Sequence, residues 1–161
     1  MTTPAEHKAD AHLLIADGRV HLFEITLAGA GGTLYLKADN TVTWQGHTWE
    51  GIGVRLDEIN RSADEQVSRP KLYIANPDAV YSPLVRDGQL NNAAVARYIV
   101  LKAHIDANTN IYHKQVWRTR MIPSVNRRVI TLELRDQSDG QFFQLPARMF
   151  MPPDFPFCSL G

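Results

Sequence analysis

Apolar and polar residues alternate along much of this 161-residue chain, in short segments separated by glycine and proline, and this period of two constrains the fold more than any other feature. Within residues 21–27 every second residue is apolar from Phe23 onward. After a break at residues 29–32, Leu34 and Leu36 resume the alternation. A period of two is typical of a half-buried strand, so the two segments predict a β-hairpin.

Two more hairpins are predicted further along the chain. Residues 41–44 and 47–50 flank Gln45-Gly46, which has the length of a tight two-residue loop and places Val42 opposite Trp49. The third hairpin pairs the alternating segments 115–122 and 129–135 around a turn at residues 123–126. These hairpins predict that most neighbouring strands of the sheet are antiparallel.

Single strands are predicted at residues 71–75 and 95–105. Pro70 cannot donate a backbone hydrogen bond, so it places the first of these at a sheet edge or marks that strand's own beginning. The second is apolar on nearly both faces, which predicts a central strand. Residues 57–69 are polar and predict an exposed excursion.

Helix signals occur twice. Thr3-Pro4 with Glu6 forms a capping box, and the spacing predicts a helix from Pro4 to about Ala16. Ser82, followed by proline, predicts the N-cap of a short helix that ends at Gly88. The predicted fold class is therefore mainly β, α+β at the margin: an antiparallel β-barrel or sandwich with an N-terminal helix and a short mid-chain helix. The domain prediction is a helical arm at 1–17, a β-rich domain at 18–145 and an extended Pro-rich segment at 146–161.

Charge and cysteine content exclude several classes of protein. Seventeen Lys and Arg balance seventeen Asp and Glu, so no summed positive field favours nucleic-acid binding as the main role, and packing within an assembly is easier to accommodate. One cysteine, Cys158, excludes an internal disulfide and a zinc site that needs two thiolates from this chain. The sequence lacks a signal-peptide h-region and the run of ~20 apolar residues that crosses a bilayer, which predicts a soluble protein made without export.

Catalytic motifs are missing from the sequence. The Walker A loop, the dinucleotide glycine fingerprint and the Gly-x-Ser-x-Gly elbow do not occur, and the six histidines include no pair at the i,i+4 spacing of a helical metal motif. We therefore predict that the protein is not an enzyme. A small hydrolase or lyase with a site among His104, Asp106 and His113 at a barrel mouth stays open as an alternative.

Two regions are candidates for contact with other subunits. Arg118, Arg120, Arg127 and Arg128 concentrate positive charge on the third hairpin, either as a solvated face or as a contact to a neighbour. The C-terminal segment combines four prolines with large apolar residues and has no helix or strand period, so it packs back on the domain or, as we prefer, binds a partner. The residues predicted to form a subunit interface are Trp117, Arg118, Arg120, Arg148, Phe150, Phe155 and Phe157.

Short motifs follow one another in an order that resembles a known family. The motifs are Phe23-Glu24-Ile25, Val42-Thr43-Trp44-Gln45-Gly46, Arg69-Pro70-Lys71-Leu72, Ile74-Ala75-Asn76, the Leu84 to Gly88 helix, Arg97, Val100-Leu101, Trp117-Arg118, the Val129 to Leu134 strand, Asp139-Gly140, and Arg148-Met149 ahead of a cysteine. Over residues 18–158 this order resembles the minor tail protein L family of lambda-like siphophages, a tail-tip hub component also found in gene transfer agents.

The resemblance implies a structural role in the virion. Members of the family would form a trimeric ring of β-barrel-like hub domains at the tail tip, between the distal tail or tube proteins and the central receptor-binding hub. The ring would adapt symmetry, seal the tube and let the genome pass, without specific nucleic-acid binding or stable membrane insertion. The protein would be made in the host cytoplasm and become part of the virion.

The resemblance also implies a cofactor. Several members carry a C-terminal extension whose cysteines hold an iron–sulfur cluster, and Cys158 matches the first of these after Arg148-Met149. One thiolate per chain cannot assemble a Cys₄ site for a 4Fe–4S cluster. We expect either that the sequence continues past Gly161 into a cluster-binding extension or that this member has lost the cluster. An iron–sulfur redox protein is therefore a second alternative function.

Overall fold

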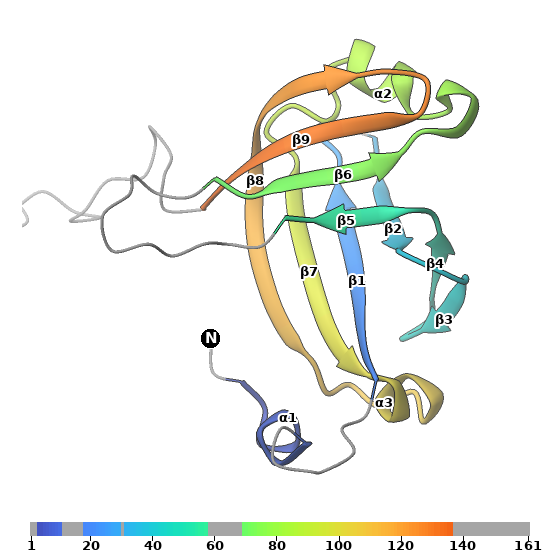
Figure 1. Ribbon diagram of the computed structural model, residues 1–161, viewed down its shortest axis with the longest axis vertical. Helices are drawn as coiled ribbons and strands as arrows, with labels where there is room; N and C mark the ends of the chain where they lie inside the picture. The colour runs from blue at the N-terminus through green and yellow to red at the C-terminus, as the bar shows by residue number, and fades with distance from the viewer. Residues whose placement is uncertain (1–2, 11–17, 30, 58–68, 137–161) are drawn as a thin grey trace, which may run out of the picture.

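Nine β-strands in one sheet dominate the computed structural model, which describes residues 3–10, 18–29, 31–57 and 69–136 (Figure 1). The strands are β1 (Arg19–Thr26), β2 (Thr33–Lys37), β3 (Val42–Trp44), β4 (His47–Gly51), β5 (Val54–Leu56), β6 (Lys71–Ala75), β7 (Ala94–Leu101), β8 (His113–Val125) and β9 (Val129–Asp136). The helices are α1 (Ala5–Asp10), the 3₁₀ turn η1 (Pro77–Ala79), α2 (Ser82–Arg86) and α3 (Lys102–Asp106). The predicted mainly β class with a small helical part is confirmed.

The strand order is β3-β4-β2-β1-β7-β8-β9-β6-β5, and every pair except one is antiparallel. The exception is β2 with β4, where Leu36 pairs with Glu50 in parallel. The chain closes the β3–β4 hairpin before it returns to β2, so β4 reaches β2 in the same direction. The outermost strands β3 and β5 belong to segments close together in the sequence, although they lie at opposite ends of the sheet order.

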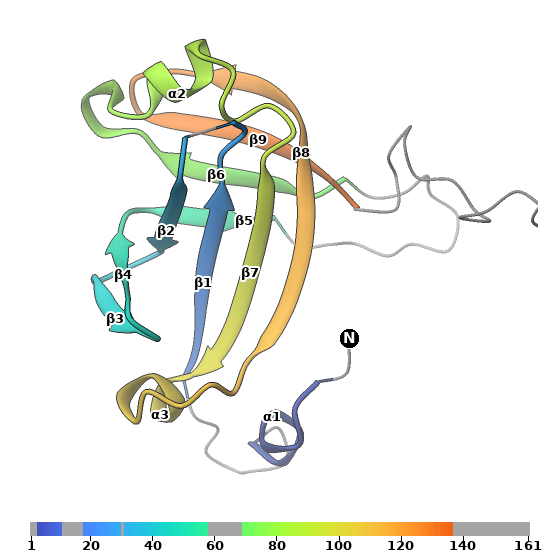
Figure 2. The same cartoon turned by 180° about the vertical axis from the view of Figure 1, so that it is seen from behind.

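The sheet curls on itself, so that β5 and β6 cross over one face of β1 and β2 (Figures 1 and 2). The fold of β8 over the top of the sheet is made possible by two register shifts, between Thr119 and Met121 and between Met121 and Ser124. Such bulges increase local bend and twist. The main core fills the space between the two halves with fully buried side chains, among them Ile25, Val95 and Leu132.

A second core covers the opposite face of β1 and β7. It contains Leu22, Val100 and Ile105, together with Trp44 and Trp49 from the β3–β4 hairpin. Because side chains alternate along a strand, β1 supplies neighbouring residues to both cores. Both central strands are therefore buried on both faces, as the sequence predicted for the strand that becomes β7.

All three predicted hairpins are present. Phe23 pairs with Leu36 across β1 and β2, and Val42 pairs with Trp49 across β3 and β4. β8 and β9 form the third hairpin, but its turn lies at residues 126–128 and not at the predicted 123–126, because β8 continues to Val125, which pairs with Ile130. The loop residue Gln45 has a φ of 51° and is followed by Gly46 at 77°, the pair of positive φ values that a type I′ turn needs.

The structure decides three further details of the sequence prediction. The central strand ends at Leu101 and not at residue 105, because β1 begins opposite Leu101 and offers no partner beyond it; the chain turns into α3 and buries Ile105 in the second core. Of the two placements predicted from Pro70, the edge is wrong, because β6 lies between β9 and β5, and Pro70 marks the beginning of the strand, directly before Lys71. Tyr81, not Ser82, is the N-cap of α2.

Ser82 has another partner in place of the cap. Its hydroxyl oxygen accepts a hydrogen bond of 3.0 Å from the side-chain amide of Asn76. The N-terminal helix is confirmed over Ala5–Asp10; Pro4, its predicted first residue, lies directly before the helix, and residues 11–16 of the predicted range lie outside the described residues. The same is true of residues 58–68 within the predicted excursion. The division into an arm, a β-rich domain and a C-terminal segment stays a prediction.

Candidate functional site

The alternation of strand β8 decides which of the predicted interface residues reach the surface. Trp117 and Thr119 point inward, with side chains 7% and 1% exposed, and Trp117 belongs to the main core. Arg118 and Arg120 point outward on the other face. The Trp117 ring therefore packs in the core of its own domain. Its assignment to a subunit contact stays a prediction.

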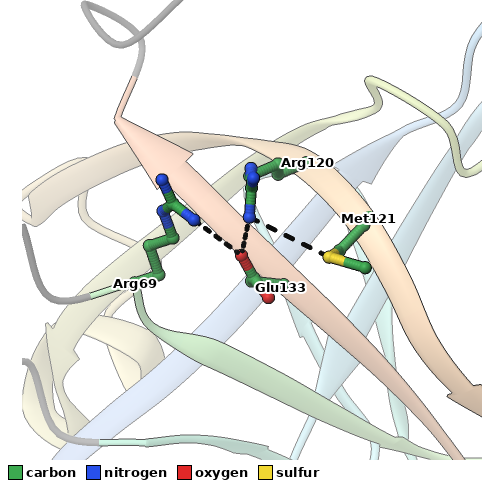
Figure 3. A network of polar contacts seen from close by, with 4 residues as sticks. All are labelled: Arg69, Arg120, Met121 and Glu133. Atoms are coloured by element: carbon green, nitrogen blue, oxygen red, sulfur yellow. Dashed lines mark hydrogen bonds and ion pairs between the residues drawn. The ribbon is translucent and has the colours of Figure 1, made fainter.

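An ion-pair network surrounds Arg120 (Figure 3). Its Nη1 atom lies 2.6 Å from Glu133 Oε1, and Arg69 Nη1 lies 3.7 Å from the same oxygen. Arg120 also donates to the sulfur of Met121 at 3.9 Å. One carboxylate therefore serves two guanidinium groups, which leaves the network with a net positive charge.

A second group of polar contacts lies on the same hairpin around Asn92. Arg118 and Arg135 are directly opposite each other on β8 and β9, an arrangement of like charges that is unfavourable unless both find acceptors. Arg118 donates to the backbone oxygen of Asn92 at 3.3 Å, and Arg135 donates to its side-chain oxygen at 3.0 Å. We call Arg69, Arg118, Arg120 and Arg135 the arginine surface. It is a preorganised cationic face on the outside of β8 and β9.

The other two predicted arginines lie elsewhere. Arg127 and Arg128 occupy the β8–β9 turn and line a groove of about 780 Å³ together with residues 51–53, 75 and 77–79. The buried Asn76 fixes this turn, because its Nδ2 donates to the oxygen of Asn126 at 2.8 Å. The sequence grouped four arginines together, and the structure separates them into two pairs at different positions of one hairpin.

A half-buried polar pair that the sequence analysis missed lies between β1 and β7. Arg97 donates to Nδ1 of His21 from Nε at 2.9 Å and approaches it from Nη2 at 2.6 Å. Burial, with Arg97 and then Arg19 nearby, lowers the pKa of His21 to about 4, and burial lowers the pKa of Arg97. Neutral His21 thus acts as an acceptor. The pairing of His21 and Arg97 needed the β1–β7 register, which local periodicity does not provide.

The residues of the alternative hydrolase site do not form a catalytic arrangement in the described part of the chain. His104 stacks on His7 with ring centroids 6.2 Å apart, and its Nδ1 lies 3.1 Å from the hydroxyl of Thr109. His104 Nε2 and His113 Nδ1 are buried and have no hydrogen-bond partner within the described ranges. Among the described residues no hydrogen bond joins either ring to Asp106, and no group of three His, Cys, Asp or Glu side chains is placed to hold a metal ion.

The C-terminal candidates lie outside the described residues. They are Arg148, Phe150, Phe155, Phe157 and the possible iron–sulfur ligand Cys158. Their predicted roles in subunit contact and metal binding stay predictions. Within the described ranges, none of the helices has the length and apolar character needed to span a bilayer.

The fold and the arginine surface together define a mainly β domain with a curled nine-stranded sheet and a cationic outer face. A solved structure with this fold is a chain in the virion of a native gene transfer agent particle, with a TM-score of 0.65 and 17% identity over 92% of this chain. The match covers 50% of that chain, so this protein spans about half its length. No protein-family model and no curated protein sequence matches this chain.

Proposed function

We propose that the protein is a structural component of the tail of a tailed bacteriophage or gene transfer agent. Within that class we propose a tail-tip hub subunit of the minor tail protein L type. The observation that carries the proposal is the shared fold with a chain of a gene transfer agent virion over 92% of this sequence. The order of short motifs over residues 18–158, which is a property of the sequence alone, also supports it.

The proposed action is mechanical. Two strands buried on both faces make a stiff sheet, since close-packed cores transmit strain. The arginine surface supplies guanidinium groups suited to carboxylates of a neighbouring subunit. A formal net charge of zero lets the domain pack between other subunits without strong repulsion. The proposed partners are the distal tail or tube proteins, the central receptor-binding hub and further copies in a homotrimer.

Cryo-electron microscopy of particles that carry this protein tests the proposal. The expected result is density for the curled nine-stranded sheet in a trimeric ring at the tail tip. A matched sample from a strain whose copy of the gene is deleted should lack this ring, and complementation should restore it. Mature, infective particles without the protein would contradict the proposal, and so would a position in the head.

The iron–sulfur cluster stays a proposal from resemblance alone, and the residues of this sequence do not fit it. A Cys₄ site needs four thiolates, and the sequence supplies Cys158 only. The described residues add no group of His, Cys, Asp and Glu that could complete a metal site. Visible absorption and iron content of the anaerobically purified product of the full gene decide the matter, and a colourless, iron-free protein would reject the cluster.

A further inference from the structure

An aromatic pocket of about 210 Å³ lies between the β3–β4 hairpin and the outer face of β1 and β7. Its lining consists of Glu24, Tyr35, Trp44, Gln45, His47, Trp49, Tyr98, Asn110 and Tyr112. Small-molecule sites usually measure about 300–1,000 Å³, so this pocket suits the head of one side chain better than a whole ligand. The role proposed above for the arginine surface does not use it.

The walls of the aromatic pocket are fixed by bonds between two turns. The indole N–H of Trp44 donates to the oxygen of Thr109 at 3.1 Å. Gln45 donates from its backbone to Asn108 Oδ1 at 2.9 Å and from its side chain to the Asn108 oxygen at 2.8 Å. Both residues have positive φ, 51° and 50°. Strained non-glycine residues persist where the surroundings fix them and often occur at binding sites, so the pocket is preformed.

The rings of the aromatic pocket are arranged around Tyr98. Trp44, Trp49 and Tyr112 meet it in T-shaped contacts, with ring centroids 6.2, 5.8 and 5.0 Å away. Lys114 Nζ lies 4.8 Å from the centroid of the same ring. The chain therefore already places one cation over this aromatic group, as the negative face of a π-system favours.

Glu24 gives the aromatic pocket a negative charge. Its Oε2 accepts a hydrogen bond of 2.5 Å from the hydroxyl of Tyr98. Burial and this carboxylate raise the pKa of Tyr98, so the phenol stays protonated and donates. No lysine or arginine is among the lining residues, and Oε1 of Glu24 has no hydrogen-bond partner within the described ranges.

We propose that the aromatic pocket binds the guanidinium group of an arginine side chain presented by another protein chain. A guanidinium is flat, weakly hydrated and always charged, so it stacks on Trp and Tyr rings while it pairs with a carboxylate. Glu24 supplies the carboxylate, and the exposed rim residues His47 and Asn110 leave the opening accessible. The proposal goes beyond the tail-tip function and does not require it.

Binding in solution to the full chain tests the proposal with N-acetyl-arginine methylamide as the probe and its neutral citrulline analogue as the control ligand. The chain has three tryptophans, of which Trp44 and Trp49 line the pocket and Trp117 lies in the main core. In ¹H–¹⁵N spectra, the indole signals of the first two should shift saturably with the arginine probe while that of Trp117 stays in place. The arginine probe should bind about tenfold more tightly than the citrulline analogue.

Glu24→Gln keeps the size of the side chain and an acceptor for Tyr98 but removes the charge, and it should weaken arginine binding about fivefold or more. The matched control is Glu50→Gln, which neutralises a carboxylate that accepts from Tyr81 at 3.5 Å on another part of the hairpin and should leave binding unchanged. If Glu24→Gln fails to fold, the difference in binding between the arginine probe and the citrulline analogue on the unchanged chain tests the proposal by itself.

The proposal would be overturned by equal binding of the arginine and citrulline probes, by saturable shifts with N-acetylglucosamine in place of arginine, or by the absence of a shift at Trp44 and Trp49. A tetramethylammonium probe that binds more tightly than arginine would also overturn it, because it would indicate a site for small free cations. None of these outcomes bears on the position of the protein in a particle, so failure here is distinguishable from failure of the tail-tip proposal.

Discussion

Asn76 is fully buried, and its side chain joins three segments of the chain. Its Oδ1 accepts from the backbone of Tyr81 at 2.9 Å, and its Nδ2 donates to Ser82 and to the oxygen of Asn126. Buried amides that are fully hydrogen-bonded hold neighbouring loops in one arrangement. Asn76 therefore fixes the start of α2 to the turn that carries Arg127 and Arg128.

Replacing Asn76 with alanine should lower the free energy of unfolding by about 2–4 kcal/mol, because it leaves the buried backbone N–H of Tyr81 and the partly buried backbone oxygen of Asn126 without their partner. Urea denaturation followed by tryptophan fluorescence measures the change. Asn40→Ala at an exposed position is the matched control and should cost less than ~0.5 kcal/mol. Equal losses in both variants would contradict the role assigned to Asn76.

At Thr119, in contrast to Asn76, removing the polar group of the side chain should not lower the stability of the protein. Its side chain is 1% exposed, and its hydroxyl has no hydrogen-bond partner within the described part of the chain. Thr119→Val removes a desolvated polar atom at nearly constant shape, so stability should stay equal or rise by up to ~1 kcal/mol. Thermal unfolding measures the effect beside Thr43→Val, an exposed strand position. A clear loss of stability at position 119 alone would show that the hydroxyl is bonded.

His21 predicts how stability depends on pH. Folding lowers the pKa of His21 from 6.5 to about 4. Between these two pH values the unfolded chain binds a proton at His21 that the folded chain does not, so the free energy of unfolding decreases as the pH falls from about 6.5 to about 4. The full shift corresponds to about 3 kcal/mol, and partial solvent exposure of the ring reduces the expected loss to about 1–2 kcal/mol. His21→Gln keeps an acceptor for Arg97 and should flatten the unfolding free energy across this window. Urea denaturation at several pH values measures the effect, and an unchanged pH dependence in His21→Gln would contradict the assignment.

At the scale of the elements, local pattern predicted pairs of strands better than their order. The hairpin around Gln45-Gly46 follows from alternation and turn chemistry, which involve only neighbouring residues. Alternation also predicted that β8 and β9 pair, but the turn between them was predicted at residues 123–126 and lies at 126–128. The parallel pairing of Leu36 with Glu50 and the place of β6 between β9 and β5 depend on contacts between distant segments. For the same reason the sequence indicated Arg118 and Arg120 as surface residues but gave no sign of the pairing of His21 with Arg97.

Gly51 shows how closely β4 approaches the preceding loop. A Cβ atom at this position would lie 2.1 Å from the oxygen of Asp39 and 2.7 Å from the nitrogen of Thr41. These are backbone atoms, so Gly51→Ala should force the loop away and cost about 2–4 kcal/mol of unfolding free energy. Gly53→Ala meets only the Cβ of Ala75 at 3.4 Å and is the matched control. Similar stability of the two variants would show that the loop yields easily.

For the whole molecule, the distribution of charge matters more than its sum. The formal charge is zero, yet the arginine surface collects four guanidinium groups around Glu133 and Asn92. Exposed ion pairs contribute about 0–1 kcal/mol each, so stability of the domain gives little reason for such a collection. A neighbouring acidic surface would gain orientation and specificity from the same groups.

Reversing the charge of Arg118 and Arg120 to glutamate therefore separates folding from assembly. Each replacement of an arginine by glutamate changes the charge by −2, so the double variant has a formal net charge of −4 where the unchanged chain has 0. Because both side chains lie on the outer face, the unfolding free energy should fall by only about 1–2 kcal/mol, while incorporation into particles should drop about tenfold or more. The matched variant reverses Arg127 and Arg128 in the groove, with the same change in net charge. Quantitative mass spectrometry of purified particles measures incorporation. Equal incorporation of the two variants would show that net charge, and not the arginine surface, governs assembly.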